Sequence, residues 1–371
     1  MGSDSTALTP HLFVDISSHG FGHLAQTAPV INALRARLPV LQLTIRCGLP
    51  RERLALRIQG DFEHIPSASD FGLTMKSALD VDRAASLARY RAFHADWESQ
   101  VNDYAQLLAQ HQPDWVLANI SYLALAAAAR AHLPATALCS LNWAEIFYPY
   151  CADAPDAGPM REQMLAAYSS AEGFLRVTPG MDMPGLNNLI PIDPIARQGQ
   201  HQRTQLHRAL GLHANARLVL VAMGGMPLHL SPMTWPHHPD LLWVVPQDAG
   251  LQRMDAISLE SIDMEFSDLI ASCDCVMTKS GYGTFVEAAA AGTPLLYVER
   301  PDWPEEPCLV AWLHQHSRAV GISREQFEHG DFGEAIWDLA CGARPTPIAP
   351  IGIEQAAEYL LARLQSTKKT S

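Results

Sequence analysis

The chain has 371 residues, and its 39 Asp and Glu residues outnumber its 26 Lys and Arg residues, which gives a formal net charge of −13. This length predicts about two domains, and 48% hydrophobic with 18% charged residues is typical of a globular protein and not of a disordered one. An acidic chain without a basic run disfavours nucleic acid as a partner. No apolar stretch reaches the roughly 20 residues that span a bilayer, and the first ten residues lack a signal-peptide pattern. We therefore expect a cytoplasmic protein without a transmembrane segment.

The seven cysteines are irregularly spaced, and their odd number argues against a disulfide framework. Cys273 and Cys275 lie within one apolar run, as buried residues of a reduced protein would. Because no second Cys or His pair lies near them in the sequence, we expect no metal site.

Short β-rich runs alternate with helical stretches in the first half of the chain. The runs with strand character are Leu12–Ile16, Leu41–Arg46, Trp115–Ala118, Thr136–Ser140 and Leu175–Thr178. The longest helical stretch is expected from Asp82 to Gln110, where large apolar residues recur every three or four positions. This alternation predicts an α/β domain with a mostly parallel sheet that helices cover on both faces.

The segment from Pro179 to Gln202 is rich in Pro and Gly, lacks periodicity, and is predicted to connect two domains. The alternation then restarts with the expected strands Leu218–Ala222, Leu241–Val245, Val276–Thr278, Leu295–Val298 and Ala319–Ile322. A last helix is expected over about Glu354 to Leu364, before a polar tail that we expect to be disordered. The predicted division is therefore 1–195, 196–353 and a C-terminal helix with its tail at 354–371.

The first expected strand leads into a glycine loop, Ser17-Ser18-His19-Gly20-Phe21-Gly22-His23. Proline is disfavoured inside a helix but tolerated in its first turn, so Pro29 predicts that the following helix begins near Thr27. The loop then lies at the carboxyl edge of the sheet, where open α/β folds bind ligands. Two readings of His19 and His23 remain open here, ligand-site residues or a tight turn with two solvated histidines.

A second glycine loop, Lys279-Ser280-Gly281-Tyr282-Gly283-Thr284, separates an expected strand from a helix that ends before Gly292 and Pro294. The N-terminus of that helix offers free N–H groups and a positive dipole end to a phosphate, and the glycines let the backbone approach it. The loop lacks the spacing of a Walker loop and of a complete G-x-G-x-x-G motif.

Two further features near these loops have alternative interpretations. Thr284 and Glu287 match a capping box, so Glu287 either closes its own helix or accepts hydrogen bonds from the ribose of a nucleotide. Gly224-Gly225 directly follows an expected strand and is either a third phosphate contact or a tight turn.

At these residues the chain resembles the GT-B glycosyltransferase superfamily, on Ser280–Glu287 followed by Gly292-Thr293-Pro294. It is most similar to the glycosyltransferase-like N-terminal region of L-arabinokinases. That region has a similar His-Gly-Phe-Gly-His loop and a similar Ser-Gly-Tyr-Gly-Thr run followed by Glu-Glu-Pro, here Glu305-Glu306-Pro307. The resemblance extends from Leu12 to about Leu313.

The resemblance implies two Rossmann-like domains that face a central cleft, with the acceptor on the N-terminal side and a nucleotide-diphosphate sugar, with a UDP-sugar as the first candidate, on the C-terminal side. It implies metal-independent sugar transfer, with His23 as the base that deprotonates the acceptor hydroxyl and His19 as the competing candidate. The donor-binding residues that it implies are the glycines of the first loop and those of the C-terminal half: Gly20, Gly22, Gly224, Gly225, Ser280, Gly281, Tyr282, Gly283, Thr284, Glu287, Glu305 and Glu306.

The chain departs from this pattern at Asn119, where many inverting relatives carry an Asp that orients the base. An amide can orient an imidazole but cannot stabilise the imidazolium with charge. This leaves a nucleotide-sugar sensor or interaction protein without transfer activity as an alternative. A nucleotide-sugar epimerase is a second alternative, with Asp70, Asp153 and Asp302 as its loose acidic candidates. The aromatic run Trp143, Phe147, Tyr148 and Tyr150 is either an acceptor wall or core.

Overall fold

The computed structural model describes residues 9–77, 79–224, 232–246 and 253–367, which form two compact units. The first unit contains the chain up to Thr74, then Val81–Asp193, and the chain from Ile351 onward. The second unit contains Met75–Asp80 and Pro194–Pro350. The sequence predicts a division at residue 195 and a separate C-terminal segment from residue 354. In the structure the helix of that segment is part of the first unit, and residues 368–371 of the expected tail lie outside the described residues.

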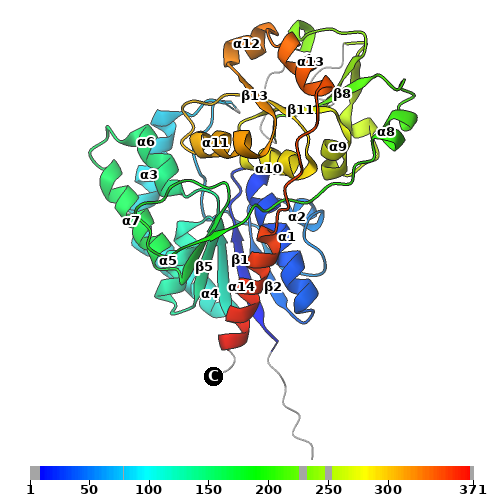
Figure 1. Cartoon of the computed structure of the whole chain (residues 1–371). Coiled ribbons are helices and arrows are strands. Elements are labelled where there is room, and N and C mark those ends of the chain that lie inside the picture. Colours follow the sequence, from blue (N-terminus) through cyan, green and yellow to red (C-terminus); the bar gives the residue numbers. More distant parts are fainter. Residues whose placement is uncertain (1–8, 78, 225–231, 247–252, 368–371) are drawn as a thin grey trace, which may run out of the picture. The chain divides into compact units, whose positions relative to one another are not determined.

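The first unit is built on a parallel sheet of seven strands (Figure 1). Their spatial order is β3 (Glu63–Ile65), β2 (Gln42–Arg46), β1 (His11–Ile16), β4 (Trp115–Asn119), β5 (Ala135–Cys139), β6 (Gly173–Val177) and β7 (Leu189–Ile192). Every residue of β1, β4 and β5 is buried. Strands that helices cover on both faces read as continuous hydrophobic runs, which is why these were visible in the sequence.

The helices of the first unit are α1 (Phe21–Arg37), α2 (Arg51–Ala55), α3 (Arg83–Ala95), α4 (Trp97–His111), α5 (Tyr122–Arg130), α6 (Trp143–Cys151), α7 (Ala157–Ser169) and α14 (Gly352–Thr367). Helix α1 connects β1 to β2 and α5 connects β4 to β5, in opposite directions along the sheet, so right-handed crossovers place them on opposite faces. Helix α14 packs beside α1, as Figure 1 shows. The Gln355 side chain exchanges two hydrogen bonds of 2.7 Å with Asp193, at the residue where the chain leaves this unit.

The second unit is built on a six-stranded parallel sheet. Its strand order is β10 (Ala256–Ser258), β9 (Leu241–Val245), β8 (Arg217–Ala222), β11 (Cys275–Lys279), β12 (Leu295–Val298) and β13 (Ala319–Ile322). Its helices are α8 (Arg203–Ala209), α9 (Phe266–Ser272), α10 (Tyr282–Ala291), α11 (Glu306–His316), α12 (Arg324–His329) and α13 (Gly333–Cys341), and its described residues also include the short 3₁₀ turns η1 (Pro232–Thr234) and η3 (Leu259–Ser261).

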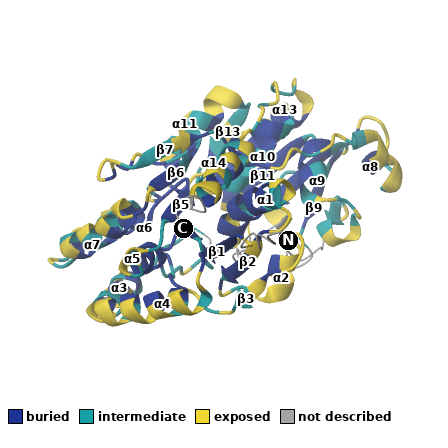
Figure 2. Cartoon of the chain, turned by 90° about the horizontal axis from the view of Figure 1, so that it is seen from below, coloured by how far each residue is buried: buried dark blue, intermediate teal, exposed yellow. Residues whose placement is uncertain are grey.

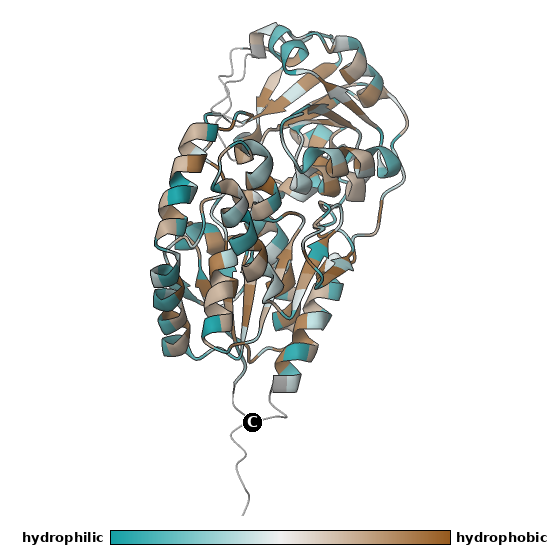
Figure 3. Cartoon of the chain, turned by 90° about the vertical axis from the view of Figure 1, so that its left-hand side faces the viewer, coloured by the Kyte–Doolittle hydropathy of each residue, from teal (hydrophilic) through white to brown (hydrophobic). Residues whose placement is uncertain are grey.

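Burial follows the layers in each unit. Figure 2 shows the strands mostly buried and the outward faces of the helices exposed, and in Figure 3 much of the strand surface has the brown of hydrophobic residues. In the second unit, Val219, Trp243, Met277 and Leu296 belong to a core that α13 covers through Ile336. None of the described helices is both long enough and apolar enough to cross a membrane.

All ten strands expected from the sequence are confirmed, with bounds that differ by at most two residues at either end. The sequence missed β3, β7 and β10, which lie at sheet edges and have three or four residues each. Strand β7 falls inside the Pro-rich segment that we expected to be only a connection. Its Pro191 is tolerated because an edge strand has one side without hydrogen-bonded neighbours.

Two helix predictions were wrong in their boundaries. Helix α1 begins at Phe21, not near Thr27, because Gly20 takes φ 104° and turns the chain directly into the helix. Pro29 therefore lies inside α1, where it leaves the Ala25 carbonyl without its helical N–H partner. The single helix expected over 82–110 is interrupted at Asp96, which has φ −102° and ψ 19° and separates α3 from α4. A one-residue break leaves the apolar periodicity nearly intact, so it is not visible in the sequence.

Candidate functional site

Both glycine loops lie where the strand order of their own sheet reverses. In the first unit the chain moves outward from β1 through β2 to β3 and resumes on the other side of β1 with β4. In the second unit β8 and β11 are the corresponding neighbours. Open α/β sheets bind ligands at the carboxyl ends of the strands at such switch points. The topology therefore places the loop after β1 and the loop after β11 at the switch point of each sheet.

His23 lies in the first turn of α1 and is tied across the switch point to the end of β4. Its Nδ1 is 2.8 Å from Oδ1 of Asn119, and both side chains are buried. The Asn119 amide nitrogen donates to Oε1 of Gln26 at 3.4 Å, which fixes its oxygen toward His23. Nδ1 therefore carries the proton, and Nε2 keeps the lone pair that a general base needs.

Burial lowers the pKa of His23 to about 4, although the hydrogen bond to Asn119 favours the charged form. The imidazole is thus neutral at physiological pH. The alternative of two solvated histidines is wrong for His23, which is 8% exposed.

The imidazole rings of His19 and His23 both contact the indole ring of Trp143. Trp143, the first residue of α6, has its ring centroid 5.2 Å from that of His19 and 5.6 Å from that of His23. Gly72 closes this group from the other side, because a Cβ atom on Gly72 would lie 2.5 Å from Cγ of His19. A Cβ on Gly20 or Gly22 would meet no atom within 4 Å, so the loop leaves open space beside the two histidines.

Two buried carboxyl groups lie below this loop. Asp70 accepts from Oγ of Ser17 at 2.7 Å and from Nε1 of Trp143 at 2.8 Å. Asp15 accepts from Oγ of Ser69 at 2.5 Å and from the Tyr104 hydroxyl. Burial raises the pKa of each carboxyl to about 6, against the opposing effect of these donors.

In the second unit, Ser280 and Gly281 lead from β11 into α10. Gly281 is the N-cap residue, no side chain caps the helix, and the first turn contains no acidic residue. A Cβ on Gly283 would meet nothing within 4 Å, and one on Gly281 only the Lys279 carbonyl at 3.8 Å. The Ser280 hydroxyl is buried and makes no hydrogen bond to any part of the chain that the structure describes. An open helix N-terminus with an unused hydroxyl beside it suits an anionic ligand.

The remaining loop residues have different positions. Thr284 and Glu287 lie inside α10 and are partly exposed, so the capping-box interpretation is wrong, because the helix begins at Tyr282. The Tyr282 hydroxyl accepts a 2.9 Å hydrogen bond from the backbone nitrogen of Ile195. Tyr282 therefore anchors the segment that enters the second unit, a role that its place in the glycine motif did not reveal.

Positive charge gathers beside this helix N-terminus. A Cβ on Gly224, which follows β8 with φ 82°, would lie 3.5 Å from Cε of Lys279 at the end of β11. Burial and the charge of Arg300 lower the pKa of Lys279 to about 8, while Glu305 opposes this shift. Gly225, the other glycine predicted here, lies outside the described residues.

The two glutamates expected near the donor sugar are both buried, and each already binds the protein. Glu306 accepts from the backbone nitrogen of Arg300 at 2.6 Å, and Glu305 accepts from Nε1 of Trp303 at 3.3 Å. The Arg300 guanidinium lies 4.4 Å from the Trp303 ring centroid. This loop after β12 is thus held by its own charged residues.

The other acidic candidates do not gather at one place. Asp153 is fully exposed beside Arg83, and Asp302 belongs to the other unit. Trp143 and Phe147 are core residues, while Tyr148 and Tyr150 are partly exposed. Within the described ranges, no group of three or more His, Cys, Asp or Glu side chains is arranged to hold a metal ion.

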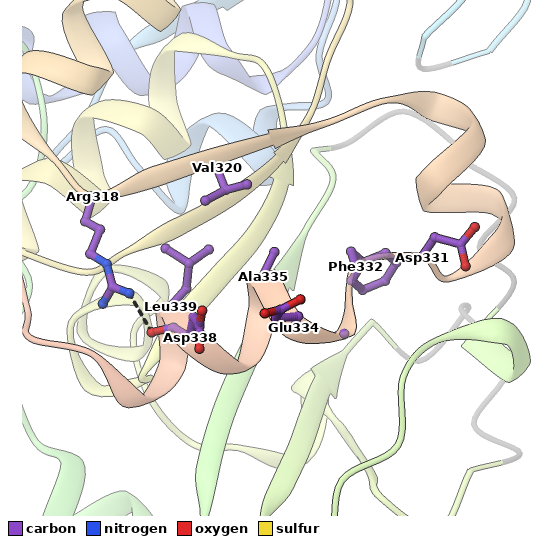
Figure 4. A pocket seen from close by; sticks show the side chains of 9 residues that line it. Arg318, Val320, Asp331, Phe332, Glu334, Ala335, Asp338 and Leu339 are labelled. Carbon is purple, nitrogen blue, oxygen red and sulfur yellow. Dashed lines mark hydrogen bonds between the residues drawn. The ribbon is translucent and has the colours of Figure 1, made fainter.

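An open cavity of about 570 Å³ lies elsewhere in the second unit, along β13 and α13 (Figure 4). Its walls include Arg318, which donates to the Asp338 carbonyl at 2.7 Å, together with Val320 and Glu334. None of the predicted site residues lines it. The sequence did not indicate Gly72, because a lone glycine between elements carries no motif, and it named Asp70 only as a candidate of the epimerase alternative and Lys279 only as part of the second glycine loop.

No protein-family model matches the chain. L-arabinokinase of Arabidopsis thaliana is 25% identical over 332 residues, which are 85% of this chain and 31% of that protein. The chain thus spans about a third of the length of this curated relative. This similarity confirms the resemblance that the glycine motifs indicated.

Solved structures match the chain along nearly its whole length. UGT89C1 of Arabidopsis thaliana has a TM-score of 0.62 at 14% identity, covering 96% of this chain and 99% of that one. The chain has the GT-B fold. Two structures with this GT-B fold were solved with nucleotides. One is UGT89C1 with UDP, which has a TM-score of 0.55 at 12% identity and covers 96% of this chain and 99% of that one. The other is the glycosyltransferase VinC with dTDP, at a TM-score of 0.54, 13% identity and coverage of 96% of each chain.

Proposed function

We propose that this protein transfers a sugar from a nucleotide-diphosphate sugar, with a UDP-sugar as the first candidate, to an acceptor hydroxyl. The observation that carries the proposal is the position of its two glycine loops, each at the switch point of its own sheet in a chain with the GT-B fold. The UDP and dTDP complexes of structurally similar glycosyltransferases support a nucleoside diphosphate as the donor group.

On the donor side, the leaving diphosphate binds at the N-terminus of α10. Ser280, Gly281, Gly283 and Thr284 supply N–H and hydroxyl donors, while Lys279 and Arg300 supply positive charge. Glu287 binds the ribose, and the loop with Glu305 and Glu306 contacts the sugar. These groups stabilise negative charge as it develops on the leaving oxygen, so the proposed step includes no metal ion.

On the acceptor side, Nε2 of His23 removes the proton from the attacking hydroxyl. The hydrogen bond from Nδ1 to Asn119 holds the required tautomer, and burial keeps the ring neutral. A buried imidazole with a pKa of about 4 is a weak base, so its catalytic effect relies on position more than on basicity. His19 is the competing candidate for the base.

Donor binding is tested by thermal-shift measurements with UDP, dTDP, GDP, ADP and uridine. A nucleotide at about 100 times its Kd adds about 2.7 kcal/mol of stability. Lys279→Met is expected to weaken UDP binding about tenfold, or about 1.4 kcal/mol, and to leave uridine binding unchanged, because the lysine acts on phosphate. Lys76→Met, which removes an exposed lysine of the same unit, is the matched control. A protein that no nucleoside diphosphate stabilises would refute the donor assignment.

Transfer is tested by UDP release from UDP-glucose in the presence of a panel of hydroxyl acceptors, with and without EDTA. His23→Gln is expected to lower kcat by about 10²–10⁴-fold at unchanged donor KM, the usual effect of removing a general base. A variant that keeps full activity would exclude His23 as the base, and loss confined to His19→Gln would transfer the role to His19.

A second function, nucleotide-sugar binding without transfer, is favoured by one observation. The partner of His23 is the neutral Asn119, which cannot stabilise an imidazolium by charge. This function predicts UDP-sugar binding without UDP release across the whole panel. The same incubation without an acceptor tests the epimerase alternative, which predicts an epimerised donor sugar.

A further inference from the structure

We propose that Asp70 is the positioning residue of the candidate base, acting through Ser17 and Trp143. It holds the loop after β1 with one carboxylate oxygen and the indole between His19 and His23 with the other. The inference rests on the proposed function for its catalytic meaning, whereas its geometric content can be tested without any substrate.

The carboxylate of Asp70 joins two separate elements. Oδ1 accepts from the Ser17 hydroxyl at 2.7 Å, and Oδ2 accepts from Nε1 of Trp143 at 2.8 Å. Asp70, Ser17 and Trp143 are 6%, 1% and 1% exposed, so water does not compete for these bonds. Hydrogen bonds to an ionised acceptor are stronger than neutral ones, and burial increases the cost of leaving them unmade.

Ser17 transmits this hold to the loop. Its backbone nitrogen donates to the Asn119 carbonyl at 2.6 Å, and its Oγ also accepts from the His19 backbone nitrogen at 3.3 Å. The residue that Asp70 binds is thus joined both to the loop histidine and to the strand end that carries the partner of His23.

Trp143 transmits the hold to the two imidazoles. Its ring meets His19 edge-on at 87° and His23 at 59°. Gly72, two residues after Asp70, leaves no room on the remaining side, since its Cβ would lie 2.5 Å from His19 and 2.8 Å from the Trp143 ring. A change in the position of the indole therefore changes the packing of both imidazoles.

The surroundings of Asp70 determine the pH range in which its carboxyl group is ionised and can accept both hydrogen bonds. Arg89 favours its ionised form, and Asp15 lies close enough for mutual repulsion. The charge of Asp70 also contributes to raising the pKa values of Tyr90, Tyr168 and Cys47. Burial raises the pKa of Asp70 to about 6. Below that pH one carboxyl oxygen becomes a donor, and the group can no longer accept from both Ser17 and Trp143 with its full charge.

The geometric test uses protein labelled with ¹⁵N in its histidines and follows the imidazole resonances from pH 4 to pH 8. His19→Gln and His23→Gln assign the two signals. In the wild type the His23 signal is expected to shift near pH 6, where Asp70 takes up its proton and well above the pKa of about 4 of His23 itself. Asp70→Asn keeps an acceptor for Trp143 and is expected to retain the high-pH positions without the shift near pH 6. Asp70→Ala removes both bonds and is expected to displace both signals at every pH.

Two further variants separate positioning from general destabilisation. Asp15→Asn alters an equally buried carboxyl that binds Ser69 and Tyr104, and it is expected to leave the shift near pH 6 in place. Trp143→Phe keeps an aromatic ring but removes the N–H. The displacements of the histidine signals in Trp143→Phe and in Asp70→Ala are expected to be non-additive in the double variant. If Asp70→Ala does not fold, the histidine signals of Asp70→Asn and Trp143→Phe still test the proposal. Histidine signals unchanged in Asp70→Asn and in Trp143→Phe across the pH range would overturn the proposal.

The kinetic test separates this inference from the proposed function. With UDP-glucose and any acceptor that the wild type uses, Asp70→Ala is expected to lower kcat about 10- to 100-fold at unchanged donor KM, the usual cost of a misplaced catalytic group. Unchanged kcat despite displaced histidines would refute the catalytic meaning. A wild type that turns over no acceptor refutes the proposed function but leaves the geometric result standing.

Discussion

Restoring a negative charge beside His23 is the sharpest perturbation that the site offers. Asn119→Asp places a carboxylate at the 2.8 Å contact with Nδ1, at a position that is fully buried. The neighbours can accommodate the change, because Gln26 can flip its amide to donate to the new oxygen. Its oxygen would then accept from the Ser140 hydroxyl, which now accepts from Gln26 at 3.2 Å.

The expected effect follows from the charge and the burial. An opposite charge within about 4–6 Å raises an imidazole pKa by about 1–3 units. The pKa of His23 is therefore expected to rise from about 4 into the range of about 5–7. Each unit is about 1.36 kcal/mol of imidazolium stabilisation, which sets a ceiling of about tenfold in rate for each unit.

The pKa is measured by pH titration of the ¹⁵N-labelled His23 imidazole, and the rate by UDP release. Asn32→Asp is the control, because it adds the same charge on the same helix at a partly exposed site that bonds only to backbone groups. A His23 pKa that stays near 4 would mean that Nδ1 does not face residue 119, and the tautomer argument would fail with it. A raised pKa without a faster reaction would refute His23 as the base while keeping the geometry.

Two further predictions concern the same unit. Gly72→Ala is expected to lower the free energy of unfolding by about 2–4 kcal/mol, because φ is +60° and the added Cβ would collide with His19. The control Gly158→Ala meets no atom within 4 Å and is expected to leave the free energy of unfolding nearly unchanged. Denaturant unfolding of the two variants measures the difference. Asp15 is more easily protonated in the folded than in the unfolded state, because burial raises its pKa from 3.8 to about 6, so its contribution to stability is present at low pH and is lost as pH rises through 6. Relative to Asp15→Asn, the wild type should lose about 2 kcal/mol of unfolding free energy between pH 4.5 and pH 7.5, and an opposite or absent trend in the same measurement would contradict the burial argument.

The acidic net charge and the proposed anionic ligand are compatible because the local field decides binding. The 39 acidic residues outweigh the 26 basic ones over the whole chain. The first turn of α10 nevertheless contains no acidic residue, and Lys279 and Arg300 lie beside it. Salt screens interactions beyond about 10 Å, so distant carboxylates weaken the attraction only slightly.

The sequence by itself determined the strand pattern and the place of both glycine loops. Hydrophobic runs such as those of β1, β8 and β12 are local signals, because each central strand must be apolar to be buried on both faces. The short edge strands β3 and β10 bury too little for such a signal. Gly20 hid the early start of α1, because a single positive φ redirects the chain without changing its hydrophobic period.

Only the tertiary structure decided what surrounds the candidate base. Asp70, Asn119 and Trp143 are far apart in the chain, and neither the 2.8 Å bond to His23 nor the carboxylate that spans Ser17 and Trp143 leaves a local pattern. The same holds for the pKa values of about 4 for His23 and about 6 for Asp70. Burial sets these values, and burial depends on which strands and helices cover a residue, a property of the assembled sheet and not of its separate segments.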